Sequence, residues 1–158
     1  MIRIRQAATA AVLLCLLSGC GNERSPRQQV RDTLEIAAES AGDRDLDRLG
    51  GFISEDYRDA EGRDRRGLIQ MVALYFRSAD TLFLRKRIHT IEVVGPREAH
   101  ATVVAAIADV PMTDLDLNRL SADFVRFELR FLREGKKWKL VEADWESVSL
   151  TEFLNSAE

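Results

Sequence analysis

The sequence has little cysteine, proline or glycine: its 158 residues include two Cys, three Pro and nine Gly. Two cysteines are too few for a disulfide framework, and so little Gly and Pro excludes a collagenous or low-complexity polymer. No run reaches the roughly 18–20 apolar residues that a membrane-spanning helix needs. A basic excess is also missing, since 23 Lys and Arg face 26 Asp and Glu. The sequence therefore gives no indication of nucleic-acid binding, and its length indicates a single domain.

The N-terminus has the layout of a targeting segment. Residues 1–5 carry Arg3 and Arg5 and no acid, and residues 7–17 (AATAAVLLCLL) carry no charge. A short basic start, a brief apolar core and small residues after it are typical of a secretory signal peptide. The apolar core is too short to span a bilayer stably, so we expect residues 1–19 to be removed.

The end of this segment, Leu16-Leu17-Ser18-Gly19-Cys20, resembles the lipobox of bacterial lipoproteins, in particular over Leu17–Cys20. The resemblance implies that the thiol of Cys20 receives a diacylglycerol, that the signal is cut before it, and that the new amine is acylated. It implies a lipid-anchored protein of the bacterial cell envelope facing the periplasm. Gly21, not an aspartate, follows the cysteine, and the resemblance to enteric lipoproteins implies that this favours the outer membrane. The alternative is an ordinary signal peptide with an incidental cysteine.

Lipidation at Cys20 would have two consequences. Two or three acyl chains anchor a protein stably where one does not, at about 0.8 kcal/mol per buried CH₂. Cys15 would leave with the signal and Cys20 would carry lipid, so the folded part would hold no thiol for catalysis or metal binding. Residues 20–25 would be a tether, whose five extended residues after Cys20 reach about 17 Å. We therefore expect the domain to lie close to the membrane surface.

The mature chain reads as helices followed by strands. Ser25 and Pro26 predict the start of a helix that ends at Gly42. A second, shorter helix is predicted over residues 43–49. Asp64 is predicted to cap a third helix, which extends to residue 79. Tyr57–Asp59 is a candidate short strand. Long strands are predicted over 82–94, 98–109, around 125–131 and 138–148, with a polar loop at 111–121. Residues 149–158 are expected to form a surface tail.

This order argues for an α+β domain over residues 26–148, with helices packed on one face of an antiparallel sheet. With Tyr57-x-Asp59, Gly62 and the terminal Trp138-Lys139-Leu140, it resembles the nuclear transport factor 2-like superfamily. That superfamily includes SnoaL-like polyketide cyclases, ketosteroid isomerase and scytalone dehydratase. The resemblance implies a strongly bent sheet wrapped around helices into a cone, whose open end is a pocket. It also implies that the open sheet face commonly dimerises, with aromatic side chains serving core and interface together.

Several polar residues are candidates for that pocket. By rough position Asp59 resembles the catalytic aspartate of ketosteroid isomerase, and Asp144 is a second carboxylate candidate. Tyr75, His100 and Asp109 lie on elements that could line the pocket. The competing interpretations are an ion-paired or solvated Asp59, a core Tyr75 with a bonded hydroxyl, and structural or surface roles for the rest.

No metal or cofactor site is predicted. The acidic triplets at 43–47 and 114–118 imitate the opening of a calcium loop, which needs Gly at its sixth position and Glu at its twelfth. Arg48 and Arg119 stand at the sixth positions, and Ser54 and Val125 at the twelfth. Phosphate-binding glycine loops, HExxH and nucleophile elbows are missing from the sequence.

The sequence therefore predicts a lipid-anchored module that binds a small apolar ligand or a protein partner, with a homodimer as a further expectation. Its alternative is an isomerase, dehydratase or hydrolase that uses Asp59 or Asp144. The basic clusters at 63–66 and 85–87 are candidates for contact with anionic lipid.

Overall fold

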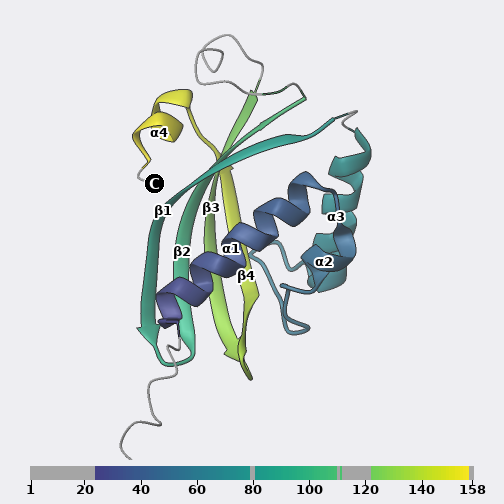
Figure 1. The fold of residues 1–158 in the computed structure, drawn as a ribbon. Coiled ribbons are helices and arrows are strands. Elements are labelled where there is room, and N and C mark those ends of the chain that lie inside the picture. The colour runs from purple at the N-terminus through teal and green to yellow at the C-terminus, as the bar shows by residue number, and fades with distance from the viewer. Residues whose placement is uncertain (1–23, 79–80, 110, 112–121, 157–158) are drawn as a thin grey trace, which may run out of the picture.

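The computed structural model describes residues 24–78, 81–109, 111 and 122–156 (Figure 1). The described chain forms helices α1, α2 and α3, then a four-stranded sheet, then helix α4. Their bounds are α1 Pro26–Gly42, α2 Leu46–Gly50, α3 Arg65–Ser78, β1 Phe83–Gly95, β2 Glu98–Ala108, β3 Ala122–Glu134, β4 Lys137–Ser147 and α4 Leu150–Asn155. No helix of these residues is both long and apolar enough to cross a membrane.

Side-chain caps set the starts of the helices. Ser25 accepts a hydrogen bond from the backbone N–H of Gln28 and Pro26 opens α1, as predicted. Asp64 accepts from the N–H of Gly67 at the start of α3, also as predicted. The second helix begins later than expected, because Asp43 closes α1 and Asp45 caps α2.

The sheet is an antiparallel meander in the order β1-β2-β3-β4. Gly135 forms the turn between β3 and β4 with a φ of 60°, a conformation that other residues rarely adopt. Irregularities in pairing occur after Ile88 in β1 and after Arg130 in β3, and such bulges increase the bend of a sheet. The expected strand at Tyr57–Asp59 is reduced to one isolated bridge, which pairs Arg58 with Asp64.

One face of the sheet, which we call the inner face, packs on the helices. Figure 1 shows α1 crossing this face, with α2 and α3 side by side at the far end of α1. Val30 and Leu34 of α1 are buried against Ile91, Val103 and Phe131 of the sheet. A second cluster joins Leu68 of α3 to residues from the segment before it and from β4. Alternating residues of each strand thus supply a core that positions the helices above the sheet.

The C-terminal residues differ from the expected surface tail. Ser149 caps the short helix α4, and Phe153 is only 2% exposed. It packs against Val104 and Ala106 on the opposite, outer face of the sheet. The guanidinium of Arg87 lies over the Phe153 ring and donates to two carbonyls at the end of α4, those of Leu154 and Ser156. Phe153 and the guanidinium of Arg87 therefore dock the tail on the sheet, together with the ion pair between Arg126 and Glu152.

Two predicted features lie outside the described residues. One is the signal segment with its lipobox and Cys20, together with residues 21–23 of the tether. The other is the acidic triplet at 114–118 in the polar loop.

Candidate functional site: an apolar cavity in the cone

A cavity of about 630 Å³ lies between the helices and the inner face of the sheet. Its walls come from α1, α2, α3, the segment after α2, the start of β1, the end of β2, and from β3 and β4. The lining residues are Thr33, Leu34, Ala37, Ala41, Leu46, Leu49, Phe52, Ile53, Leu68, Ile69, Met71, Val72, Tyr75, Phe76, Leu82, Leu84, Ile107, Asp123, Val125, Phe127, Leu129, Phe131, Leu140, Ala143, Trp145 and Ser147. The volume is that of a small-molecule site.

Local sequence explains why this space stays open. Val125, Phe127, Leu129 and Phe131 alternate along β3, so all four side chains point to the inner face. On the side of α1 that faces the sheet, Val30 and Leu34 are followed by Ala37 and Ala41, whose methyl groups fill little of the volume between helix and sheet. Large residues on the strands and small ones on the helix therefore leave an apolar chamber.

Only four lining residues have polar side chains: Thr33, Tyr75, Asp123 and Ser147. Tyr75, at the C-terminal part of α3, is 40% exposed, so the cavity reaches the surface beside it. Burial and, second, the charge of Asp123 raise the pKa of the Tyr75 hydroxyl. The hydroxyl therefore stays protonated at neutral pH and is a hydrogen-bond donor at the rim.

Asp59 lies outside the lining of this cavity, in a buried network of its own. Its side chain is 0% exposed, and its two oxygens accept from the backbone N–H and the Nε of Arg63, both at 2.8 Å. The hydroxyl of Tyr57 lies 3.4 Å from the same carboxylate. Burial alone would raise the pKa of Asp59, but the hydrogen bonds and charge of Arg63 outweigh it, so the pKa is lowered.

This network is built for structure. Burial and the Asp59 charge raise the pKa of the Tyr57 hydroxyl, which therefore remains a donor to a carboxylate that remains ionised. The guanidinium of Arg63 also lies 4.9 Å from the ring centre of Trp145, a residue of the cavity wall. Asp59 thus supports the wall from behind through Arg63.

The other predicted polar residues also lie elsewhere. Asp144 is exposed and accepts from the adjacent N–H of Trp145. His100 is exposed with its Nε2 3.1 Å from Glu98, because its neighbours in β2 occupy the inner face. Asp109 is exposed after the end of β2, where its backbone carbonyl accepts from the Thr81 hydroxyl. Of the three expected pocket residues, Tyr75 alone lines the cavity.

The sequence did carry a signal for a residue that we did not predict. Asp123 precedes Val125, Phe127 and Leu129 in strict alternation, which places it on their face of β3. Thr33 has a similar signal, since it comes three residues after Val30 and four before Ala37, a spacing that places all three on one face of α1. Among the described residues, no group of three or more His, Cys, Asp or Glu is arranged to hold a metal ion.

The outer face of the sheet carries ion pairs and α4. Arg126 pairs with Glu146 of β4 and Glu152 of α4, and Arg130 pairs with Glu142 at 2.8 Å. The expected aromatic interface is not displayed there: Phe124 is partly buried under α4, whereas other aromatic residues of the sheet face inward, namely Phe127, Phe131, Trp138 and Trp145. The homodimer stays a prediction.

No protein-family model and no curated protein matches this chain. Solved structures do match in fold. A proposed dehydratase of the nuclear transport factor 2-like family from Streptomyces avermitilis aligns over 77% of this chain and 96% of its own, with 17% identity and a TM-score of 0.61. A ketosteroid isomerase-like protein from Erwinia carotovora atroseptica aligns over 80% and 98%, with 7% identity and a TM-score of 0.61.

A third structure, Bd1075 of Bdellovibrio bacteriovorus, aligns over 78% of this chain at 10% identity and a TM-score of 0.60. The chain spans 41% of that longer protein. Identities this low show the fold alone. The chain therefore has the α+β cone of the nuclear transport factor 2-like fold, with a curled four-stranded antiparallel sheet and helices on its inner face, as the sequence predicted.

Proposed function

We propose that this protein is a lipid-anchored envelope protein whose cone binds a small, largely apolar ligand. The observation that carries the proposal is the 630 Å³ cavity, whose lining has four polar side chains among many apolar ones. Binding in such a site is driven by removing apolar surface from water, at about 25 cal/mol per Å². The Tyr75 hydroxyl and the Asp123 carboxylate favour a ligand with one polar end at the rim.

Binding is favoured over catalysis by the protonation states. A general acid or base works best with a pKa near the operating pH. The pKa of Asp59 is lowered and its oxygens are occupied by Arg63, while the pKa of Tyr75 is moved further above neutrality. Neither shift prepares a group for proton transfer at neutral pH.

The alternative function is an isomerase or dehydratase. The specific observation in its favour is the carboxylate of Asp123 on the cavity lining, together with neighbours in fold that are a ketosteroid isomerase-like protein and a proposed dehydratase. If this alternative holds, Asp123→Asn should abolish turnover of a bound substrate while leaving its affinity nearly unchanged. Substitution of Asp59 or Asp144, the two carboxylates that the sequence suggested, would leave the turnover of bound substrate unchanged in the same assay.

A fluorescence titration tests the binding proposal. The chain has two tryptophans, of which Trp145 lines this cavity and Trp138 does not. N-phenyl-1-naphthylamine, an apolar probe that accepts energy from tryptophan, should quench the emission of the wild type saturably. Trp145→Phe keeps an apolar ring in the wall and should reduce the quenching, because Trp138 is then the only remaining donor.

Cavity-filling variants give the matched comparison. Ala37→Phe and Val72→Phe place bulk inside the cavity, whereas Ile36→Phe adds a ring on the exposed side of α1. We expect the first two to weaken probe binding at least tenfold and the third to leave it unchanged. Equal affinities in all four proteins would contradict a ligand site in the cone.

The anchor rests on the lipobox at Leu17–Cys20 and is tested separately. Labelled palmitate should enter the wild-type chain in cells, and Cys20→Ala should remove the label. Ser18→Ala, which keeps a small residue before the cysteine, is the matched control and should be labelled normally. Equal labelling of wild type and Cys20→Ala would overturn the anchor without affecting the cavity.

A further inference from the structure

A second cavity, of about 720 Å³, lies at the other side of the wall formed by Thr33 and Phe52, which line both cavities. We call it the basic groove. Its lining residues are Arg24, Gln29, Asp32, Thr33, Arg48, Gly51, Phe52, Arg133, Lys136, Lys137, Trp138 and Lys139. Six of these are Arg or Lys and one is acidic, in a chain whose net charge is −3.

Three of these cationic side chains already have an ion pair or a hydrogen bond within the protein. Arg24 pairs with Asp32 at 2.7 Å, Arg48 pairs with Glu39 outside the groove at 3.0 Å, and Lys139 donates to the carbonyl of Gly51. These contacts are at the surface, where ion pairs contribute little. They leave three of the six cations, namely Arg133, Lys136 and Lys137, without such a contact among the described residues.

The β3–β4 hairpin supplies the charge that remains available. Within the described chain, Lys136 and Lys137 are exposed and have neither an ion pair nor a side-chain hydrogen bond. The Nε of Arg133 is buried and likewise has no acceptor among these residues. Arg133 lines the groove, so its guanidinium adds a third cation to the two lysines.

The groove lies at the end of the domain where the chain enters. Figure 1 shows the start of α1, the β1–β2 turn and the β3–β4 turn at one end of the molecule, opposite α4. Arg24 follows Cys20 by four residues, a distance of about 14 Å at full extension. A lipid on Cys20 would therefore hold this end, and not the α4 end, next to the bilayer.

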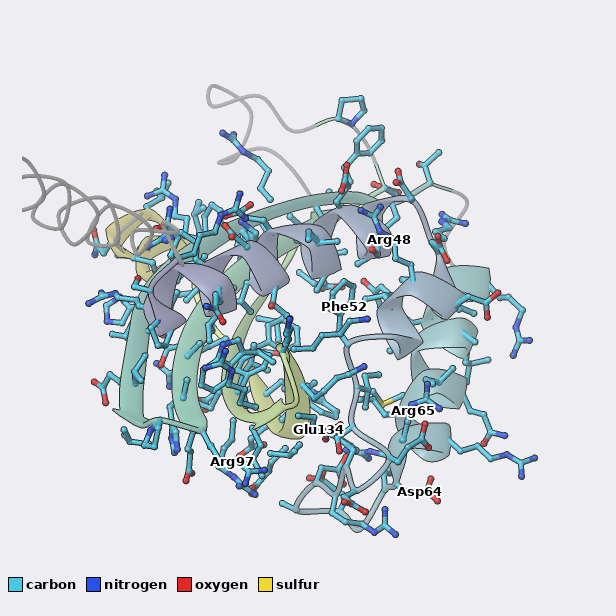
Figure 2. All side chains as sticks on the ribbon, turned by 60° about the horizontal axis from the view of Figure 1, so that its bottom comes forward. Arg48, Phe52, Asp64, Arg65, Arg97 and Glu134 are labelled. Carbon is cyan, nitrogen blue, oxygen red and sulfur yellow. The ribbon has the colours of Figure 1, made fainter. Side chains whose placement is uncertain are left out.

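The β1–β2 hairpin extends the same surface. The carbonyl of Arg97 accepts from the N–H of Arg133 at 2.8 Å, so its turn lies against the end of β3. Figure 2, in which this end comes forward, places Arg97 and Glu134 on neighbouring turns. Val94 of this hairpin is 59% exposed. An apolar side chain beside cations is the composition of a surface that lies in the headgroup region of a membrane.

The clusters that the sequence suggested for this role are largely engaged within the protein, although Arg66 is exposed. Arg63 pairs with Asp59 and Glu61, and Arg65 pairs with Glu55. Arg87 is bound to the end of α4. Lys86 pairs with Glu35. Most cationic side chains of the two clusters therefore already have partners, whereas Lys136 and Lys137 of the basic groove have none among the described residues.

We propose that the basic groove binds the phosphate of anionic phospholipid headgroups and orients the domain on the bilayer. Arg133 and the two lysines Lys136 and Lys137 contact the headgroup, and Val94 enters the interface. The orientation relative to Cys20 rests on the proposed lipid anchor, whereas headgroup binding by the groove does not. The mouth of the apolar cavity, at Tyr75 and Asp123, is then left accessible.

Vesicle binding tests this in chains that all carry Cys20→Ala, so that no acyl anchor contributes and the N-terminal segment is the same throughout. Binding is measured to vesicles of phosphatidylcholine alone and with one third phosphatidylglycerol. Lys136→Gln/Lys137→Gln removes two charges from the groove. Arg66→Gln/Arg77→Gln removes two charges from exposed positions of α3 and is the matched control. Arg133→Gln examines the buried guanidinium.

The parent chain should prefer the phosphatidylglycerol vesicles, and the preference should fall as salt is raised. The variant Lys136→Gln/Lys137→Gln should reduce the preference for phosphatidylglycerol about tenfold or more, since each basic residue near an anionic surface strengthens binding about fivefold. Arg133→Gln should reduce it further, and the control pair should leave it unchanged. Equal losses in both pairs would mean diffuse electrostatics and would overturn the proposal.

A free anion is distinguished in the same assay. If inorganic phosphate at millimolar concentration protects the parent chain against thermal unfolding while its vesicle binding ignores phosphatidylglycerol, the groove serves a soluble phosphate and the lipid assignment is wrong. Loss of palmitate labelling at Cys20 with normal vesicle preference would count against the anchor and not against the groove. The two proposals therefore fail separately.

Discussion

The Nε of Arg63 lies 2.8 Å from the Oδ2 of Asp59, and that carboxylate side chain is completely buried. Arg63 also donates its backbone N–H to the other oxygen, and the pKa of Asp59 is lowered despite its burial. The residue that by position resembles a catalytic aspartate is thus an ionised, fully engaged partner of an arginine. Its place behind Trp145 makes it part of the support of the cavity wall.

Replacing Asp59 should therefore reduce stability. Asp59→Asn removes the buried carboxylate that pairs with Arg63 and leaves only the exposed Glu61 as its counter-charge, which we expect to lower the free energy of unfolding by about 3 kcal/mol. Urea denaturation measures the change. Glu61→Gln is the control, because Glu61 pairs with the same arginine from an exposed position and should cost less than about 1 kcal/mol. Equal stability of Asp59→Asn and wild type would contradict a structural role.

The same carboxylate predicts a pH dependence. Its pKa is lower in the folded protein than in the unfolded chain, so its contribution is complete above the unfolded pKa, about 4, and is lost as pH falls through the folded value. The difference in stability between wild type and Asp59→Asn should be constant from about pH 6 to 7 and shrink below about pH 4. A stability difference that grows as the pH falls would contradict a lowered pKa for Asp59 in the folded protein.

The helices and strands were predictable because their signals are local. The Ser25 cap with Pro26, the Asp64 cap and the alternation in β3 each fix an element without reference to the rest of the chain. The end of the chain was not predictable in this way. Docking of α4 depends on Phe153 finding Val104 and Ala106, which lie far away in sequence. A six-residue helix has too weak a periodicity to show this contact.

The site was predictable only in part, because polar residues were assigned by element and not by face. Alternation along β2 places His100 on the outer face, because its neighbours Ala99 and Ala101 face inward. The shift in pairing after Arg130 changes which residues of β3 and β4 are cross-strand partners. Tyr75 was found because it lies on the apolar stripe of α3. The basic groove could not be found from sequence, since α1, α2 and the β3–β4 hairpin meet only in the fold.

Helix α4 should control self-association. Phe153→Ala removes a buried ring and should lower stability by about 3 kcal/mol, while Leu154→Ala, at an exposed position, should change it by less than about 1 kcal/mol. Undocking also uncovers Val104, Ala106 and Phe124. We therefore expect Phe153→Ala to form dimers in sedimentation experiments at concentrations where Leu154→Ala behaves as wild type. An unchanged sedimentation profile would show that α4 does not protect this face.

The rim of the cavity should recognise the polar end of a ligand. Tyr75→Phe removes a donor and keeps the ring, so the affinity for a long-chain alcohol should fall about five- to tenfold, as for one hydrogen bond. The affinity for N-phenyl-1-naphthylamine, which has a weaker polar group, should change less. Calorimetry with both ligands measures the difference. Equal losses for the two would assign Tyr75 a packing role instead.

The most direct test of the central claim is to locate a bound apolar probe by nuclear magnetic resonance. On addition of N-phenyl-1-naphthylamine, we predict intermolecular contacts to methyl and ring protons of Leu34, Val72, Phe127 and Trp145, which line the cavity. Val104, Ala106 and Phe153 on the outer face should show none. Contacts confined to that outer cluster, or no saturable contacts at all, would contradict a ligand site within the cone.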